Sequence, residues 1–124
     1  MLRLGSERDE LGIIFDQVGT PTYAKDLAAV VLQGIFSSKF EHPGCEVYHY
    51  SNEGVCSWYD FAKAIFELSN IRCKVNAIET KDYPTPARRP TYSVLNKAKI
   101  KTEAGLLVPY WRDSLKECLI NLNS

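Results

Sequence analysis

Residues 11–22 read LGIIFDQVGTPT, and our interpretation of the fold starts from this stretch. Leu11 to Asp16 is a short apolar run with β-branched and aromatic side chains, which predicts a buried strand. A turn-rich loop, Gln17 to Thr22, follows it, and Thr22 is suited to cap a helix. Loops between the carboxyl end of a strand and the start of a helix often bind ligands in α/β folds. The stretch therefore predicts a strand that leads into a candidate binding loop.

Apolar periodicity extends this pattern along the chain. Strand-like runs cover residues 46–51 and 74–79, and an extended loop with three prolines covers 80–91. Helical spacing of apolar residues predicts helices over four ranges: 23–36, 58–70 with Ser57 and Asp60 as a capping box, 96–105, and 109–122. We therefore expect one α/β or α+β domain over residues 1–124, with short strands and about four helices.

Several side chains are assigned to the core or to solvent by this periodicity. One face of the first long helix is expected to be buried because it carries Leu27, Val30, Val31 and Ile35. Trp58 and Trp111 lie on the apolar stripes of two other helices and are expected in the core. Lys97, Lys99 and Lys101 alternate with apolar residues and are expected to face solvent.

Composition narrows the classes of function. The 124 residues hold 15 Lys and Arg against 15 Asp and Glu, so no net charge attracts nucleic acid or acidic membranes. Charged residues interrupt the first fifteen positions, and the most apolar run, 27–36, is too short to span a membrane. We expect a cytoplasmic protein. The four cysteines lack C-x-x-C spacing, which favours reduced thiols over disulfides or zinc.

Two catalytic signatures were considered. The glycines are too widely spaced for G-x-G-x-x-G, so the chain has no dinucleotide-binding turn of its own. Tyr59 and Lys63 have the Y-x-x-x-K spacing by which some reductases lower the pKa of a phenol. Because the apolar neighbours of Tyr59 lie on the core side of the helix, we favour the interpretation that Tyr59 and Lys63 are an ordinary exposed pair.

The candidate binding residues are polar side chains in two loops. Gln17, Thr20 and Thr22 could offer hydrogen bonds to a ligand, or Thr22 could only cap the helix and Gln17 only satisfy backbone groups. Residues 81–101 hold six basic side chains against Asp82 alone. Arg88 and Arg89 lie in its proline-rich part, where a guanidinium held by stiff backbone suits a phosphate or diphosphate. A solvated basic loop is the alternative.

Four stretches together resemble a known family. LRLGSERDELGIIFDQVGTPTYAKDLA, SNEGVCSWYDFAKAI, ARRPTYSVLNKAKI and the helix after VPYW resemble the C-terminal part of the dTDP-4-dehydrorhamnose reductases, which are extended short-chain dehydrogenases. The resemblance covers nearly the whole chain, and DQVGTPTYAKDLA is its most specific part. It implies an enzyme that uses NADPH to reduce the 4-keto group of a dTDP-sugar, giving dTDP-L-rhamnose for cell-surface polysaccharide.

The resemblance also implies what lies outside this chain. Family members carry a dinucleotide-binding half and the catalytic Tyr-x-x-x-Lys before the point that matches Met1, so Tyr59 and Lys63 are not the catalytic pair. We therefore expect a substrate-binding fragment that is inactive alone and has no catalytic, cofactor-binding or metal-binding residue. NADPH would be bound by the N-terminal half. Magnesium and a homodimer are family properties for which no residues are assigned.

The resemblance points to four residues of the substrate site. Gln17, Thr20 and Thr22 match the family's DQ-x-G-x-P-T loop, and Arg89 with Pro90 matches its R-P element. These are the expected contacts with the dTDP-sugar, and the chain's own N-terminal domain is its expected partner. The alternative is a non-catalytic nucleotide-sugar-binding or regulatory module of the same family.

Overall fold

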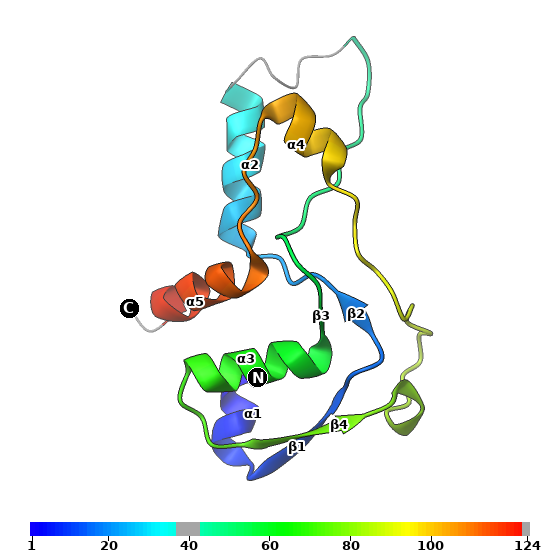
Figure 1. Ribbon diagram of the computed structural model, residues 1–124, viewed down its shortest axis with the longest axis vertical. Coiled ribbons are helices and arrows are strands. Elements are labelled where there is room, and N and C mark those ends of the chain that lie inside the picture. The colour runs from blue at the N-terminus through cyan, green and yellow to red at the C-terminus, as the bar shows by residue number, and fades with distance from the viewer. Residues whose placement is uncertain (37–42, 123–124) are drawn as a thin grey trace.

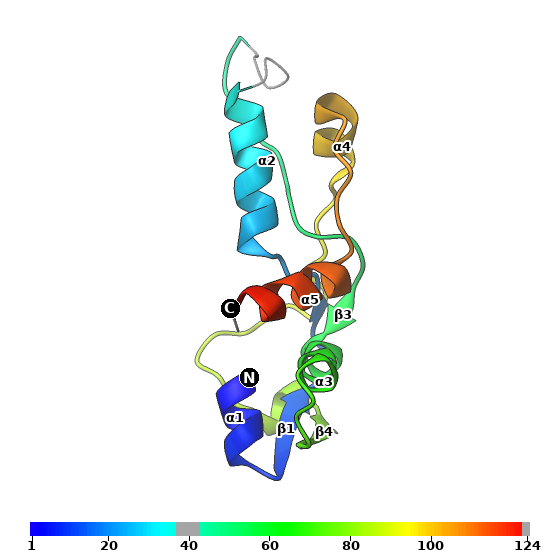
Figure 2. The same ribbon diagram turned by 90° about the vertical axis from the view of Figure 1, so that its left-hand side faces the viewer.

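The computed structural model describes residues 1–36 and 43–122 (Figure 1). In chain order the elements are α1 (Leu2–Glu7), β1 (Glu10–Ile14), β2 (Val18–Gly19), α2 (Ala24–Phe36), β3 (Cys56–Ser57), α3 (Trp58–Leu68), β4 (Lys74–Ile78), the 3-10 helix η2 (Thr80–Asp82), α4 (Ala98–Ala104) and α5 (Trp111–Leu122). The molecule is elongated: α1, α3, β1 and β4 form one end, α2 and α4 the other, and α5 with β2 and β3 lies between (Figures 1 and 2). The predicted mixture of helices and short strands is confirmed, although the periodicity analysis missed α1.

The strands form two small sheets. β1 and β4 pair in parallel, from Glu10 opposite Lys74 to Ile14 opposite Ile78. β2 and β3 pair antiparallel, with Val18 opposite Ser57 and Gly19 opposite Cys56. The predicted strands near residues 11–16 and 74–79 are confirmed, and the structure shows that they share one sheet. Because parallel strands need a long connection, α2 and α3 both lie within the crossover between them.

Local signals set both ends of α3. Asp60 N–H donates to Ser57 Oγ at 3.0 Å, and Ser57 N–H donates to Asp60 Oδ2 at 3.0 Å, which completes the predicted capping box. At the other end Asn70 adopts a positive φ of 54°, and Ile71 N–H donates to Phe66 O at 2.9 Å. The capping residues therefore fix where α3 begins and ends.

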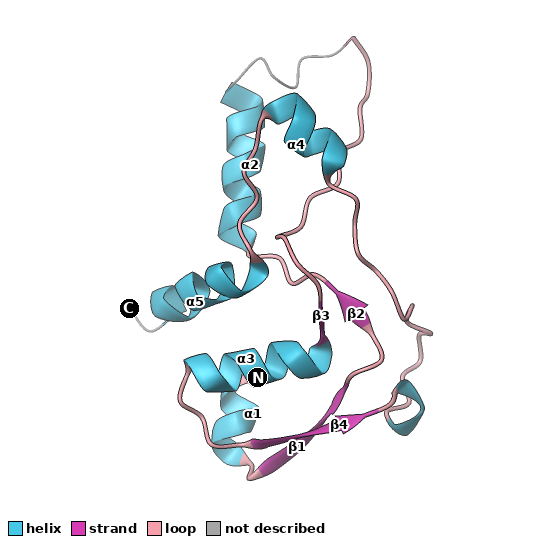
Figure 3. Ribbon diagram, viewed as in Figure 1, coloured by secondary structure: helices cyan, strands magenta, loops and turns pink. Residues whose placement is uncertain are grey.

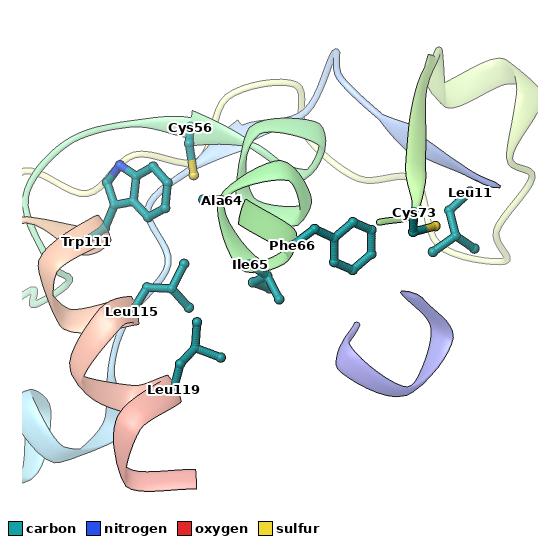
Figure 4. Packing of buried hydrophobic residues seen from close by; sticks show 9 residues of the cluster. All are labelled: Leu11, Cys56, Ala64, Ile65, Phe66, Cys73, Trp111, Leu115 and Leu119. Carbon is teal, nitrogen blue, oxygen red and sulfur yellow. The ribbon is translucent and has the colours of Figure 1, made fainter. Parts of the chain in front are cut away.

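The core gathers around α3 (Figure 4). Ala64, Ile65 and Phe66 are buried between the β1–β4 sheet on one side and α5 on the other. From α5 the buried side chains are Trp111, Leu115 and Leu119, and from the sheet side they are Leu11 and Cys73. The Phe61 and Trp111 rings meet edge to face with centroids 6.0 Å apart. The expected burial of Trp111 is confirmed.

The expected burial of α2 is wrong. Leu27 and Val31 are 40% and 50% exposed, and Phe36 at the end of the helix is 85% exposed. No buried side chain occurs among the α2 residues whose burial is described, while the side chain of Ile35 lies outside the described residues. A helical stripe is buried only where another element packs on it, and α2 stands apart from the α3 core (Figure 1).

The predicted strand over residues 46–51 is also wrong. The segment has no strand partner among the described residues, and Val47 is 66% exposed. It is tied to α4 by side chains instead: Lys99 Nζ donates to Val47 O at 3.3 Å, and Tyr48 Oη donates to Glu103 Oε2 at 2.6 Å. Strand-forming residues remain extended loop when no neighbouring backbone completes their hydrogen bonds.

The region around α4 ends at the predicted glycine, but its N-cap residue is Lys97, one position after the predicted Asn96, and the predicted exposure also differs. Ala98 N–H donates to Asn96 Oδ1 at 2.8 Å, and Gly105 ends the helix with a φ of 62°. Lys97, however, is only 7% exposed, so its expected position at the surface is wrong. Its ammonium is enclosed because it donates to Ser51 Oγ at 3.4 Å and to Asn52 O at 3.2 Å. Among the described helices, none is long and apolar enough to cross a membrane.

Gly54 should be the least replaceable glycine in the loop before β3. Its φ is +90°, and a Cβ there would overlap the Tyr110 ring and come within 2.8 Å of Trp111 Cδ1. Gly54→Ala should lower the free energy of unfolding by about 2–5 kcal/mol, from left-handed strain plus overpacking. Gly44→Ala is the control, because Gly44 has a positive φ but nothing within 4 Å of a Cβ, so only strain of about 1–2 kcal/mol applies. Urea unfolding measures both variants, and an equal loss of unfolding free energy in Gly54→Ala and Gly44→Ala would contradict the predicted clash.

Candidate functional site

The candidate site is a cavity of about 560 Å³ between two loops and the start of α3. One wall is the loop from Gln17 to Pro21, and the floor includes Cys56, Ser57, Trp58 and Phe61. The opposite wall is the arm after η2, residues 83–93, which contributes Tyr83, Thr85, Arg89, Pro90 and Ser93. In Figure 3 the arm after η2 runs past β2 on its way to α4. The two loops singled out from the sequence therefore meet in space.

The polar side chains of the first loop are largely used inside the protein. Thr20 Oγ1 donates to Gly54 O at 2.6 Å, which ties the loop to the segment before β3. Gln17 is buried, and its Nε2 donates to Thr80 Oγ1 at 3.0 Å. Both residues line the cavity, but the amide of Gln17 and the hydroxyl of Thr20 each donate a hydrogen bond inside the protein. Their main effect is to fix the shape of the cavity wall. Their side-chain oxygen atoms can still accept hydrogen bonds from a ligand.

Asp16 anchors the start of the second loop. Thr80 donates to Asp16 Oδ1 twice, from its backbone N–H at 2.9 Å and from Oγ1 at 2.7 Å. The Thr80 hydroxyl bond is the largest cause of the lowered pKa of Asp16, and burial opposes it. The chain of bonds from Gln17 through Thr80 to Asp16 therefore joins both walls of the cavity.

The arm is held beside β2 by backbone bonds. Val18 N–H donates to Thr91 O and Ser93 N–H donates to Val18 O, both at 2.9 Å. These bonds place Arg89 and Pro90 at the cavity, whereas Arg88 is not among its lining residues. Among the described residues no carboxylate lies within ion-pair distance of Arg89. The Arg89 guanidinium is thus the cationic group at this site that has no partner in the described protein.

Aromatic rings supply much of the remaining surface. Trp58 is 57% exposed and lines the cavity with Phe61 and Tyr83. The expected burial of Trp58 in the core is therefore wrong. It is the first residue of α3, immediately after the capping residue Ser57, where a side chain lies at the open end of the helix. The position of Trp58 at the start of a helix, directly after a loop, was the sequence signal that could have indicated a binding role.

Thr22 and the Tyr59–Lys63 pair lie outside the cavity lining. Thr22 Oγ1 donates to Thr20 O at 3.5 Å, and Tyr23 N–H at the start of α2 donates to Asn52 Oδ1 at 2.8 Å. Thr22 therefore donates back to its own loop, and the N–H of Tyr23, the residue before α2, is bonded by Asn52. Lys63 Nζ lies 5.9 Å from the centroid of the Tyr59 ring, a surface pair as the sequence favoured.

The described residues include no evident metal or dinucleotide site. In the ranges 1–36 and 43–122, no three His, Cys, Asp or Glu side chains gather to hold a metal ion. The sequence offers no glycine-rich turn for a dinucleotide. No magnesium ligands and no dinucleotide turn are therefore assigned to the described residues.

The Cys56 thiol should react slowly with alkylating reagents although it lines the cavity. Burial raises its pKa to about 11, and the nearby Asp60 carboxylate adds to the shift, so the thiolate becomes abundant only near that pH. At pH 8 iodoacetamide should label Cys56 at least about 10-fold more slowly than the exposed Cys45, and the Cys56 rate should rise steadily with pH. Peptide mass spectrometry measures both rates, with Cys45→Ser as the control that removes the fast site. Similar rates at pH 8 would show that Cys56 is not protected.

A cavity bounded by strand-to-helix loops, with aromatic walls and one guanidinium that has no partner among the described residues, is typical of a ligand-binding site in an α/β protein. The whole chain, residues 1–124, matches the family described as "RmlD substrate binding domain", and the protein belongs to that family. The resemblance predicted from the sequence is confirmed.

Three relatives illustrate the similarity. The chain is 43% identical over 119 residues to the spore coat polysaccharide biosynthesis protein SpsK of Bacillus subtilis, covering 96% of this chain and 40% of SpsK. A crystal structure of a dTDP-4-dehydrorhamnose reductase from Clostridium acetobutylicum is similar with a TM-score of 0.91 and 41% identity, covering 99% of this chain and 42% of that one. The dTDP-4-dehydrorhamnose reductase of Bacillus anthracis, solved in complex with NADP, has a TM-score of 0.88 and 35% identity, covering 97% and 41%. The chain thus spans about two fifths of the length of these relatives.

Proposed function

We propose that this chain is the substrate-binding part of a dTDP-4-dehydrorhamnose reductase, which reduces dTDP-4-dehydro-L-rhamnose to dTDP-L-rhamnose with NADPH for cell-surface polysaccharide. The observation that carries the proposal is the cavity that Arg89 lines together with the Gln17–Pro21 loop. The family and the named relatives support the same reaction. Within residues 1–124 the role is binding and orientation, and the chain alone does not turn over.

The chemistry of the cavity suits a nucleotide-sugar. The unpaired guanidinium of Arg89 can bind the diphosphate with two charge-assisted hydrogen bonds, and Pro90 limits the freedom of its backbone. Trp58 and Tyr83 offer ring faces for the flat base or the apolar side of a deoxysugar. By fixing the sugar, these groups would hold its 4-keto carbon in the orientation that a hydride donor needs.

The exposed face of α2 and segment 46–51 support a partner for this chain: the N-terminal part that the relatives contain. Leu27 and Val31, one turn apart on α2, are 40% and 50% exposed, and Val47 in segment 46–51 is 66% exposed. Apolar surface of this kind suits packing against another domain. About three fifths of each relative's length lies outside the match. We assign this surface to that part, which would bind NADPH, in preference to a second copy of the chain.

A chimera tests the proposed function. The chain is joined behind the N-terminal part of the Clostridium acetobutylicum reductase, in place of the segment it matches there. The chimeric reductase should oxidise NADPH when dTDP-4-dehydro-L-rhamnose is added, while the chain alone should not. The parent Clostridium enzyme is the control for substrate and assay. A folded chimera that binds the sugar nucleotide without turnover would favour the non-catalytic binding module instead.

Arg89 should dominate substrate affinity. In the chimeric reductase, Arg89→Ala removes the charged bonds to the diphosphate and should weaken substrate binding by roughly 1–3 kcal/mol, which is a rise in KM of roughly 5- to 150-fold. Arg88→Ala is the matched control, since it removes the same charge from the neighbouring position outside the cavity lining. Steady-state kinetics measure both. If Arg89→Ala leaves KM and kcat unchanged, Arg89 is not part of the site.

A further inference from the structure

Asn52 is a fully buried amide outside the cavity lining. Its side chain is 0% exposed and lies where the start of α2 meets the start of α5. Oδ1 accepts from Tyr23 N–H at 2.8 Å, and Nδ2 donates to Asp26 Oδ2 at 2.7 Å and to Ser114 Oγ at 2.8 Å. Ser114 Oγ in turn donates to Asp26 Oδ2 at 2.6 Å. The amide, the carboxylate and the hydroxyl therefore form a closed set of bonds.

The binding loop is attached to residues 52–57 at successive points. Val18 and Gly19 pair with Ser57 and Cys56 in the small β2–β3 sheet. Thr20 Oγ1 then donates to Gly54 O, and Tyr23 N–H donates to Asn52 Oδ1. The last of these bonds fixes the end of the loop where it turns into α2. The cavity-lining residues 19–21 lie between the fixed points.

Residues 52–54 are themselves immobilised from the other side. Glu53 N–H donates to Pro109 O at 2.8 Å, and Trp111 N–H donates to Glu53 O at 2.9 Å. The buried ammonium of Lys97 donates to Asn52 O at 3.2 Å and lies 3.6 Å from Glu53 Oε2. The support for the loop therefore comes from the start of α5 and the residue before α4, which both lie outside the cavity.

We propose that Asn52 is a positioning residue for substrate binding, acting with Asp26 and Ser114 to hold the Gln17–Thr22 loop in the shape that the cavity needs. This proposal rests on the proposed function of the cavity. Loss of the amide leaves the Tyr23 N–H without its acceptor, and leaves Asp26 and Ser114 with only their bond to each other. The loop end then has to shift toward water, and residues 19–21 move with it.

Asn52→Asp is the sharpest variant, because it keeps the acceptor for Tyr23 N–H and the size of the side chain. It replaces the Nδ2 donor by a carboxylate oxygen facing Asp26, and two carboxylates at hydrogen-bond distance repel each other. Asn76→Asp is the matched control: Asn76 Nδ2 also donates to a carboxylate, Glu10 Oε2 at 3.0 Å, but at an exposed site on β4. The double variant Asn52→Asp with Asp26→Asn exchanges the two groups and restores one donor facing one acceptor.

Hydrogen–deuterium exchange of the 124-residue chain tests positioning without any activity. Asn52→Asp should speed exchange of the amides in residues 18–23 by at least about 10-fold, and leave those of β4 unchanged. Asn76→Asp should leave residues 18–23 unchanged, and the double variant should recover most of the protection. Equal acceleration in β4 and in the loop, or no acceleration in the loop, overturns the positioning role.

Kinetics in the chimeric reductase connect the loop to the substrate. Asn52→Asp should raise KM for the sugar nucleotide roughly 10- to 100-fold and leave KM for NADPH unchanged, because only the substrate loop is displaced. Loss of folded enzyme alone would lower the apparent kcat with both KM values unchanged, and that result would contradict the proposal. Ser114→Ala is the milder variant if Asn52→Asp does not fold, and it should raise the same KM by a smaller factor. An unsubstituted chimera that binds no sugar nucleotide would overturn the proposed function, while the exchange data still decide the role of Asn52.

Discussion

The packing of α3 determines where the other elements can lie. Ile65 and Phe66 are buried on the inner surface of this helix, between the β1–β4 sheet and the Trp111 end of α5. The start of the same helix carries Ser57, which both caps it and pairs with Val18. The hydrophobic contacts that fold the chain therefore also bring the binding loop to the cavity. Displacement of α3 would also remove Trp58 and Phe61 from the cavity that they line.

Internal hydrogen bonds give the polar residues of the cavity different roles. Gln17 and Thr20 donate to Thr80 and to Gly54, so their main contribution is a wall of fixed shape. Arg89 has no described carboxylate partner and is the group left to meet an anionic ligand. A wall of fixed shape beside a cation with no partner among the described residues is an arrangement that can orient an anionic ligand.

The face of α2 that carries Leu27 and Val31 is largely exposed, although Ile100 and Ala104 of α4 are buried in the same half of the molecule. The exposed Val31 and Val47 belong to elements with strong helical and strand patterns, and each pattern lacks the surface that would bury it. Asn52 links this region to the cavity, because its amide joins Tyr23 and Asp26 at the start of α2. Association of another domain with α2 would therefore stabilise the binding loop as well.

Sequence alone determined the elements whose signals are local: the β1 and β4 strands, both ends of α3, and the glycine end of α4. Capping, turns and apolar periodicity act between residues close in the chain, so they can be read without knowing the fold. Tertiary structure decided the rest. Elements distant in sequence decide whether Trp58 lies in the core or in the cavity and whether segment 46–51 becomes a strand. They also decide whether Thr22 or Asn52 bonds the backbone at the start of α2. Those outcomes follow from which surfaces find partners, and periodicity carries no information about the partner.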